Sequence, residues 1–148
     1  MPRLRALLLV AVSALALPAT TGCGSDGDAA AEAVPRWVQP ERYSFTLVSE
    51  GGERRGIGTF RITVADGKVV EAVGLDESAR LAVAGGTRDL WTLEDLLAEL
   101  RQARADEADV ADAVFAPDGH PTEIHIDGET NSVDDEADYR ITEYRVHP

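Results

Sequence analysis

The sequence predicts an α+β fold in which an antiparallel sheet of about six strands carries one helix packed on a face. Short segments of alternating apolar and polar residues, typical of half-buried strands, occur before and after a single segment of helical periodicity. Strand runs on both sides of one helix favour α+β over a parallel sheet, in the order β-β-β-α-β-β-β. A chain of 148 residues with 44% apolar content can also supply the one buried core that this fold needs.

Three strands are expected before the helix. Residues 43–47 and 59–64 alternate between apolar and polar side chains, which is the period of a half-buried strand. Asp66-Gly67 predicts a tight hairpin into a third strand at residues 68–73. Residues 75–89 contain two adjacent glycines and stay ambiguous between loop and regular structure.

The helix is the most clearly indicated element. Thr92 is expected to be its N-cap, and Asp95 three residues later completes a pattern like a capping box. Leucines then recur at i, i+3, i+4 and i+7, and we expect this apolar stripe to pack on the sheet. Trp37 and Trp91 are expected to pack at the sheet edge and at the helix entry. The stripe consists of Leu93, Leu96, Leu97 and Leu100.

Three more strands are expected after the helix. They cover residues 110–115, 122–127 and 139–146, and the first two are joined by a turn at residues 117–119. A polar loop at residues 128–138 is expected between the last two strands.

The N-terminus predicts a lipoprotein signal peptide at residues 1–22. Arg3 and Arg5 precede an apolar run at residues 6–17, which is too short to cross a bilayer but has the size of a signal-peptide core. The following Thr-Thr-Gly-Cys resembles a bacterial lipobox ending at Cys23, the only cysteine of the chain. Cys23 is therefore the expected lipidation site. The alternative is an ordinary secretory signal with a coincidental cysteine.

The remaining chain is expected to form a tether and one domain. Residues 23–36 are small and acidic, with little to bury, and indicate a flexible tether. Residues 37–148 are expected to form the single α+β domain. Acylated Cys23 would bind the lipid bilayer, which places the domain on the extracytoplasmic face of the cell membrane, and stable attachment needs more than one acyl chain.

Charge argues against one class of partner. The formal net charge is −13, which argues against binding to nucleic acid because phosphates require lysine and arginine. The acidity is concentrated in residues 106–148, which contain 13 acids and 2 bases. Such a segment indicates either a solvated surface or a face that binds cations or a basic partner.

Four segments carry a resemblance to a known family. They are YSFTL at 43–47, ITVADGKVV at 62–70, TLEDLL at 92–97, and PTEIHID at 121–127 continuing to Asp134-Asp135-Glu136. Together they resemble a family of actinobacterial lipoproteins whose domain has no assigned function. The resemblance extends from about Trp37 to the C-terminus and implies a secreted, anchored domain, but no reaction. Many members of that family have a cysteine pair near the first hairpin, where this chain has Glu-Gly-Gly-Glu at residues 50–53. Any role of that pair is therefore absent here.

The acidic loop after residue 126 is a candidate calcium site. With Asp127 counted as position one, its oxygen-bearing side chains fall at positions one, three, five, nine and twelve. This spacing is similar to that of a calcium-binding loop. Position six is Ser132 instead of glycine, position twelve is a short aspartate, and the flanking segments are strands. The alternative is a structural loop whose side chains cap backbone groups in turns. The candidate ligands are Asp127, Glu129, Asn131, Asp135 and Asp138, with Ca²⁺ as the one possible cofactor.

Glu123, His125 and Asp127 share one face of a predicted strand because they are spaced by two residues. A histidine between carboxylates can serve as a general base or a metal ligand, although alternating polar residues also suit any solvated strand face. His120 and His147 have no partner that the sequence indicates. The chain contains no G-x-S-x-G, phosphate-loop or H-E-x-x-H motif, so no catalytic residue is assigned.

These observations favour a membrane-anchored extracytoplasmic lipoprotein that acts as a non-enzymatic binding or structural module. An envelope protein is its possible partner, and its specific function is open. Alternatives are a Ca²⁺-dependent envelope module that uses residues 127–138, a hydrolase that uses His125, and an inhibitor-like domain that presents residues 50–56 to a partner.

Overall fold

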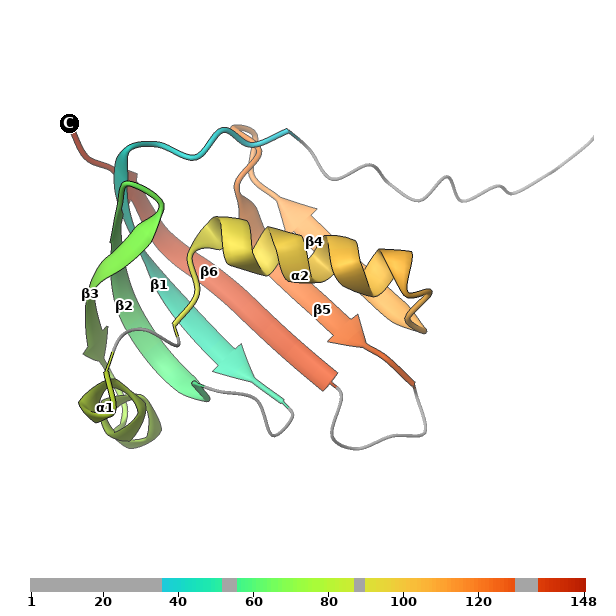
Figure 1. Cartoon of the computed structure of the whole chain (residues 1–148), viewed down its shortest axis with the longest axis horizontal. Helices are drawn as coiled ribbons and strands as arrows, with labels where there is room; N and C mark the ends of the chain where they lie inside the picture. Colours follow the sequence, from blue (N-terminus) through green and yellow to red (C-terminus); the bar gives the residue numbers. More distant parts are fainter. Residues whose placement is uncertain (1–35, 52–55, 87–89, 130–135) are drawn as a thin grey trace, which may run out of the picture. The chain divides into compact units, whose positions relative to one another are not determined.

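A computed structural model describes residues 36–51, 56–86, 90–129 and 136–148. These residues form an antiparallel sheet of six strands with two helices, in the order β-β-β-α-α-β-β-β (Figure 1). The α+β class is confirmed, and one helix more is present than the sequence predicts. Cys23, with the predicted signal peptide and almost all of the tether, lies outside the described residues.

The sheet has the strand order β3-β2-β1-β6-β5-β4 and all its neighbours are antiparallel. The chain builds one half of the sheet before the helices and the other half after them, and β1 pairs with β6 at the centre. The strands are β1 (Arg42–Glu50), β2 (Gly58–Ala65), β3 (Lys68–Gly74), β4 (Val110–Phe115), β5 (Pro121–Asp127) and β6 (Glu136–Val146).

The predicted hairpin between β2 and β3 is present at Asp66-Gly67. Both residues have positive φ angles, 51° for Asp66 and 71° for Gly67. Positive φ at both central positions is the requirement of a type I′ turn, whose twist matches that of the flanking strands. The turn therefore fixes the register of this hairpin.

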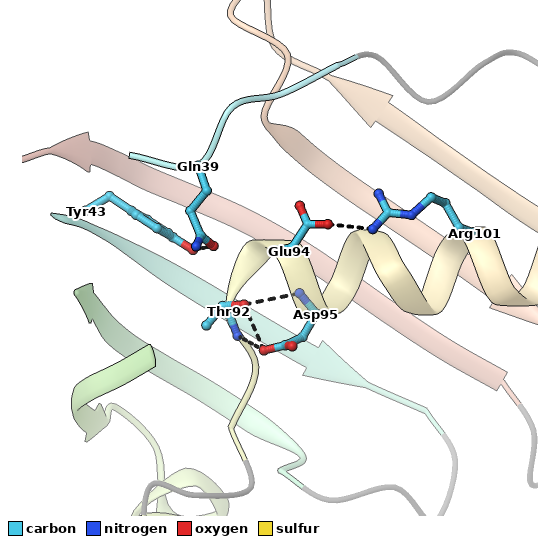
Figure 2. A network of polar contacts seen from close by, with 6 residues as sticks. All are labelled: Gln39, Tyr43, Thr92, Glu94, Asp95 and Arg101. Atoms are coloured by element: carbon cyan, nitrogen blue, oxygen red, sulfur yellow. Dashed lines mark hydrogen bonds and ion pairs between the residues drawn. The ribbon is translucent and has the colours of Figure 1, made fainter. Parts of the chain in front are cut away.

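Helix α2 (Leu93–Ala105) begins with the predicted capping box (Figure 2). The Thr92 backbone N–H donates to Asp95 Oδ2 at 2.8 Å, and the Asp95 backbone N–H donates to Thr92 Oγ1 at 3.1 Å. The Tyr43 hydroxyl accepts from the Leu93 backbone N–H at 3.2 Å and donates to Gln39 Oε1. Strand β1 and the segment before it are thereby tied to the start of α2. Burial raises the pKa of the Tyr43 hydroxyl, so it stays a neutral donor.

The core lies between α2 and one face of the sheet. The four leucines of the α2 stripe are buried, as predicted, and pack against the inward side chains of the strands. Trp37 contacts the rings of Tyr43 and Tyr144 edge-on, and Trp91 contacts the ring of Tyr139. Strand residues in this cluster include Tyr43, Phe45, Leu47, Phe60, Ile62, Val64, Ile124, Ile126, Tyr139 and Ile141.

Helix α1 (Glu77–Ala84) occupies part of the segment that the sequence leaves ambiguous. Asp76 caps it, because its carboxylate accepts from the Ala79 backbone N–H at 2.8 Å and from the Thr59 backbone N–H at 2.6 Å. These bonds hold the pKa of the Asp76 carboxyl below its ordinary value. A Cβ on Gly74 would lie 2.3 Å from the Arg80 backbone nitrogen, so only glycine permits this close approach of α1.

Strand β6 begins at Glu136, three residues before the predicted start. Glu136 pairs with Asp127, and Asp138 pairs with His125. The predicted polar loop at 128–138 is therefore too long, since its last three residues continue the ladder. Alternating side chains on a strand do not mark where backbone pairing starts, which explains the error.

The second face of the sheet is covered by neither described helix. Both helices contribute to the same buried cluster, whereas the alternate strand residues are absent from it. In Figure 1, α2 runs across one face of β5 and β6. We call the other side the open face. It includes Ser44, Thr46, Val48, Arg61, Glu123, His125 and Arg140. Within the described residues, neither helix has the length and apolar character to cross a bilayer.

Candidate functional site

The open face carries two shallow hollows, and the first lies over β1, β6 and β5. It has a volume of about 300 Å³. His125 Nδ1 lies 2.5 Å from Asp138 Oδ1 across the β5–β6 ladder. Arg140 Nε lies 3.8 Å from Glu123 Oε1 at the next position of the same ladder. Its lining is Val48, Glu50, Glu123, Ile124, His125, Asp138, Tyr139 and Arg140.

Two of the three residues that the sequence groups on one strand face line this hollow, Glu123 and His125. The third, Asp127, is only 8% exposed and does not line it. The contact with Asp138 orients the His125 ring and leaves Nε2 as the nitrogen that can exchange a proton with a bound molecule. No serine, threonine or cysteine is among the described residues that line the hollow, so its candidate nucleophiles are carboxylates and water.

The candidate calcium ligands fall into two groups. Asp127, Glu129 and Asp138 are described, whereas Asn131 and Asp135 lie outside the described residues. Asp138 is a strand residue that contacts His125, in contrast to its predicted place at the end of a loop. The described residues contain no group of three or more histidine, cysteine, aspartate and glutamate side chains placed to hold a metal ion.

Asp127 is nevertheless unusual in its surroundings. It lies at the end of β5, where it pairs with Val110 and Glu136. Its Oδ1 atom is buried and receives no hydrogen bond within the part of the chain that the structure describes. A buried carboxylate oxygen without a donor is costly, and an ion or an ordered water is a common reason for one.

The second hollow lies over β2, β1 and the end of β6, and has a volume of about 250 Å³. Ser44 Oγ lies 2.8 Å from His147 Nε2. The Thr46 hydroxyl and the Arg61 guanidinium both donate to Glu143 Oε2, each at 2.8 Å. The lining consists of Ser44, Phe45, Thr46, Arg61, Glu143, Arg145 and His147.

A β-bulge in β6 builds this hollow. Thr142 pairs with Thr46 and Arg145 pairs with Ser44, so that Glu143 and Tyr144 together oppose the single residue Phe45. Glu143 has a φ of 51°, in the left-handed region that residues other than glycine rarely adopt. The extra residue lets Tyr144 pack against the core while Glu143 stays on the open face.

Glu143 is held as a carboxylate by its neighbours. Two hydrogen bonds lower the pKa of the Glu143 carboxyl below its ordinary value, and the bond from Thr46 has a larger effect than the bond from Arg61. Tyr144, the residue after Glu143, stays neutral because burial raises the pKa of its own hydroxyl.

Sequence reasoning misses the second hollow. His147 has Ser44 as a partner, and His120 contacts Asp118 and stacks on the Tyr144 ring at 4.1 Å, although no partner is predicted for either histidine. Of the residues that line the hollow, only Arg145 stands out in the sequence, because it is one of two bases in the acidic last third. The bulge that brings the other groups together leaves no pattern. Of the loop at 50–56 that an inhibitor would present, residues 52–55 lie outside the described part.

The comparisons with known proteins assign the family. The model of a family of unknown function, DUF6174, matches residues 29–146, and the chain belongs to this family. That match agrees with the expected resemblance to a domain without an assigned function. No curated protein matches the chain. No solved structure matches it either.

Proposed function

We propose that this protein is a lipid-anchored extracytoplasmic binding module without catalytic activity. In this proposal Cys23 carries the anchor, and the open face of the sheet binds a polar partner in the cell envelope. The observation that carries the proposal is the open face itself, a full sheet surface that neither described helix covers and that contains both hollows.

The polarity of the open face supports the proposal. A sheet face that is polar only to keep the protein in solution needs no hollows. A binding surface, in contrast, offers concave sites with a few convergent polar groups. Both hollows are lined mainly by charged and hydroxyl-bearing side chains, so a polar or charged partner fits them better than an apolar one. The acidic segment between Cys23 and the domain would act as a tether that holds the domain off the bilayer.

The anchor is tested with Cys23→Ser in the full chain. We expect the wild-type protein to take up an alkyne-labelled fatty acid and to remain in the membrane fraction. The Cys23→Ser variant should lose the label and leave that fraction, because no acyl chain then holds it. Equal membrane retention of both proteins, without label in either, would contradict the anchor.

The binding surface is tested by photo-cross-linking in cells that express the full chain. A photoreactive phenylalanine replaces Val48 or Val73, which lie on the open face beside Arg140 and Arg61. Gln102, exposed on α2, is the matched control on the other side of the domain. We expect the same adduct from both open-face positions and none from Gln102. Adducts from Gln102 alone, or from no position, would contradict the proposal.

A Ca²⁺-dependent module is the second candidate, and the buried Oδ1 of Asp127 favours it. Calcium binds carboxylate oxygens, and an ion at this atom would remove the cost of leaving it without a partner. Glu129 follows two residues later on the same segment.

A thermal melt of the full chain tests this candidate, first with EDTA and then with Ca²⁺. A ligand at about a hundred times its Kd adds about 2.7 kcal/mol, which corresponds to a rise in Tm of about 10 °C for a domain of this size. The rise should be absent in Asp127→Asn and absent with Mg²⁺. A Tm that does not respond to Ca²⁺ in the wild type would exclude the candidate.

A hydrolase is the third candidate, and the contact of His125 with Asp138 favours it. An oriented imidazole beside a hollow could act as a general base on water. The test is ester or glycan hydrolysis by the wild type and by His125→Ala. Equal turnover by both proteins, or turnover by neither, would exclude His125 as the catalytic base.

A further inference from the structure

We infer that the second hollow is an anion subsite that binds a carboxylate or phosphate group of the partner. The inference names the chemistry of one part of the open face and rests on the proposed binding role of that face. It follows from three features of the hollow, which are its charge, its donors and its backbone.

The charge of the second hollow is opposite to that of the rest of this region. Arg61 and Arg145 line it with Glu143 as the one carboxylate, whereas the first hollow is lined by three carboxylates and one arginine. Residues 106–148 contain only two bases, Arg140 and Arg145, and each lines one hollow. An anion is therefore attracted to the second hollow and repelled by the first.

The donors of this hollow already hold one carboxylate. Glu143 accepts from the Thr46 hydroxyl and from Arg61 Nη2, so an external carboxylate or phosphate would bind the other N–H groups of the Arg61 guanidinium. The charge of Arg145 acts on Glu143, but its guanidinium makes no hydrogen bond within the described residues, so its N–H groups can bind a ligand. The Ser44 hydroxyl and His147, 2.8 Å apart, complete the rim.

The backbone at this hollow is held in an unfavourable conformation. Glu143 adopts a left-handed φ of 51°, which costs of order 1 kcal/mol and persists only where the surrounding contacts impose it. Bulges of this kind are frequent beside functional sites because they redirect side chains. Here the bulge directs Glu143 toward Thr46 and Arg61.

The size of the hollow limits what it accepts. A volume of about 250 Å³ is below that of the pockets that enclose whole cofactors or drug-sized ligands. It fits one small oxyanion group, whose remaining part would extend over the open face. We therefore expect weak binding of the isolated group and tighter binding of the molecule that carries it.

The test titrates the purified full chain with inorganic phosphate and, separately, with acetate, at constant ionic strength set with NaCl. The side-chain N–H resonances of Arg145 and Arg61 and the imidazole resonances of His147 are followed by NMR. We expect saturable shifts of these resonances with at least one probe. Saturation by phosphate alone would assign a phosphate-bearing ligand, and saturation by acetate alone would assign a carboxylate-bearing one.

Arg145→Gln and Arg140→Gln form a matched pair, since both remove one arginine from the open face of β6. Arg145→Gln should weaken binding about tenfold or more, because a hydrogen bond to a charged group contributes about 1.5–3 kcal/mol. Arg140→Gln should leave the Kd within about twofold. Both variants should keep the wild-type melting curve, and Ser44→Ala, expected to weaken binding less than Arg145→Gln, provides a second perturbation of the hollow.

The inference would be overturned by shifts that do not saturate, or by equal weakening in Arg145→Gln and Arg140→Gln. Its failure is separate from failure of the proposed function. Cross-links from the open face without anion binding would retain the binding module and remove the subsite. Anion binding without cross-links would retain the subsite and remove the envelope partner.

Discussion

The two faces of the one sheet differ in composition and in what covers them. The covered face is apolar, and its side chains pack against the α2 leucines with almost no exposure. The open face carries charged pairs, two hollows and a strained bulge, none of which adds much to a hydrophobic core. The comparison teaches that open-face residues can be replaced without disturbing the core, because alternate residues of the same strands belong to different surfaces.

The largest expected effect comes from the covered face. Leu96→Ala removes a fully buried side chain and should lower the free energy of unfolding by about 2–5 kcal/mol, through lost burial and the cavity that remains. Urea denaturation measures the change. Gln102→Ala, on the exposed side of the same helix, is the control and should change the value by less than about 0.5 kcal/mol. Similar losses in the two variants would remove the distinction between the faces.

The capping box should contribute less than a buried leucine. Thr92→Ala leaves the Asp95 backbone N–H without its acceptor and should cost about 1 kcal/mol. The expected loss is visible as a lower Tm in a thermal melt, while far-UV circular dichroism at 25 °C stays unchanged. A loss as large as that of Leu96→Ala would indicate that the capping box does more than stabilise the first turn of α2.

The bulge on the open face is tested by two substitutions at one position. Glu143→Gly and Glu143→Ala both remove the carboxylate, but glycine adopts a φ of 51° without strain and alanine does not. The glycine variant should therefore be more stable than the alanine variant by about 1 kcal/mol in urea denaturation. Equal stability would show that the bulge relaxes when Glu143 is replaced.

The pH dependence of stability gives a smaller effect at the same position. The folded pKa of Glu143 lies below its ordinary value of 4.5, so the folded state binds this proton less readily than the unfolded state. The resulting stabilisation is complete above the ordinary pKa and disappears as pH falls through the folded pKa. As pH falls from 5 through the folded pKa of Glu143, the free energy of unfolding should therefore decrease less in Glu143→Gln than in the wild type. Urea denaturation at several pH values measures both curves. Parallel curves would contradict the assigned contacts.

The sequence predicts the covered face well. Apolar alternation and the leucine stripe identify the core residues, because burial imposes a period on side-chain polarity. The Asp-Gly hairpin and the Thr92 cap are also recovered, since each depends on local backbone chemistry. Helix α1 is missed because eight residues are too few to establish a helical period and two adjacent glycines follow them. Only Asp76, as its N-cap, marks where it begins.

The open face is predicted only in part. Spacing by two residues correctly groups Glu123 with His125, but it cannot show that Asp138 joins them from another strand. The second hollow depends on a bulge and on pairing between β1 and the chain's last residues, which are far apart in sequence. Non-local pairing of this kind leaves no periodic signal in a single sequence.

The most direct test of the account combines stability and binding in one pair of variants. Arg140→Glu reverses a charge on the open face, and Arg101→Glu reverses an exposed charge on α2. Both should keep the free energy of unfolding within about 0.5 kcal/mol of the wild type, since exposed ion pairs contribute little. The yield of the adduct from a photoreactive residue at position 48 should then fall severalfold in Arg140→Glu and stay unchanged in Arg101→Glu. An equal yield in both variants, or a fall in Arg101→Glu alone, would contradict the assignment of binding to the open face.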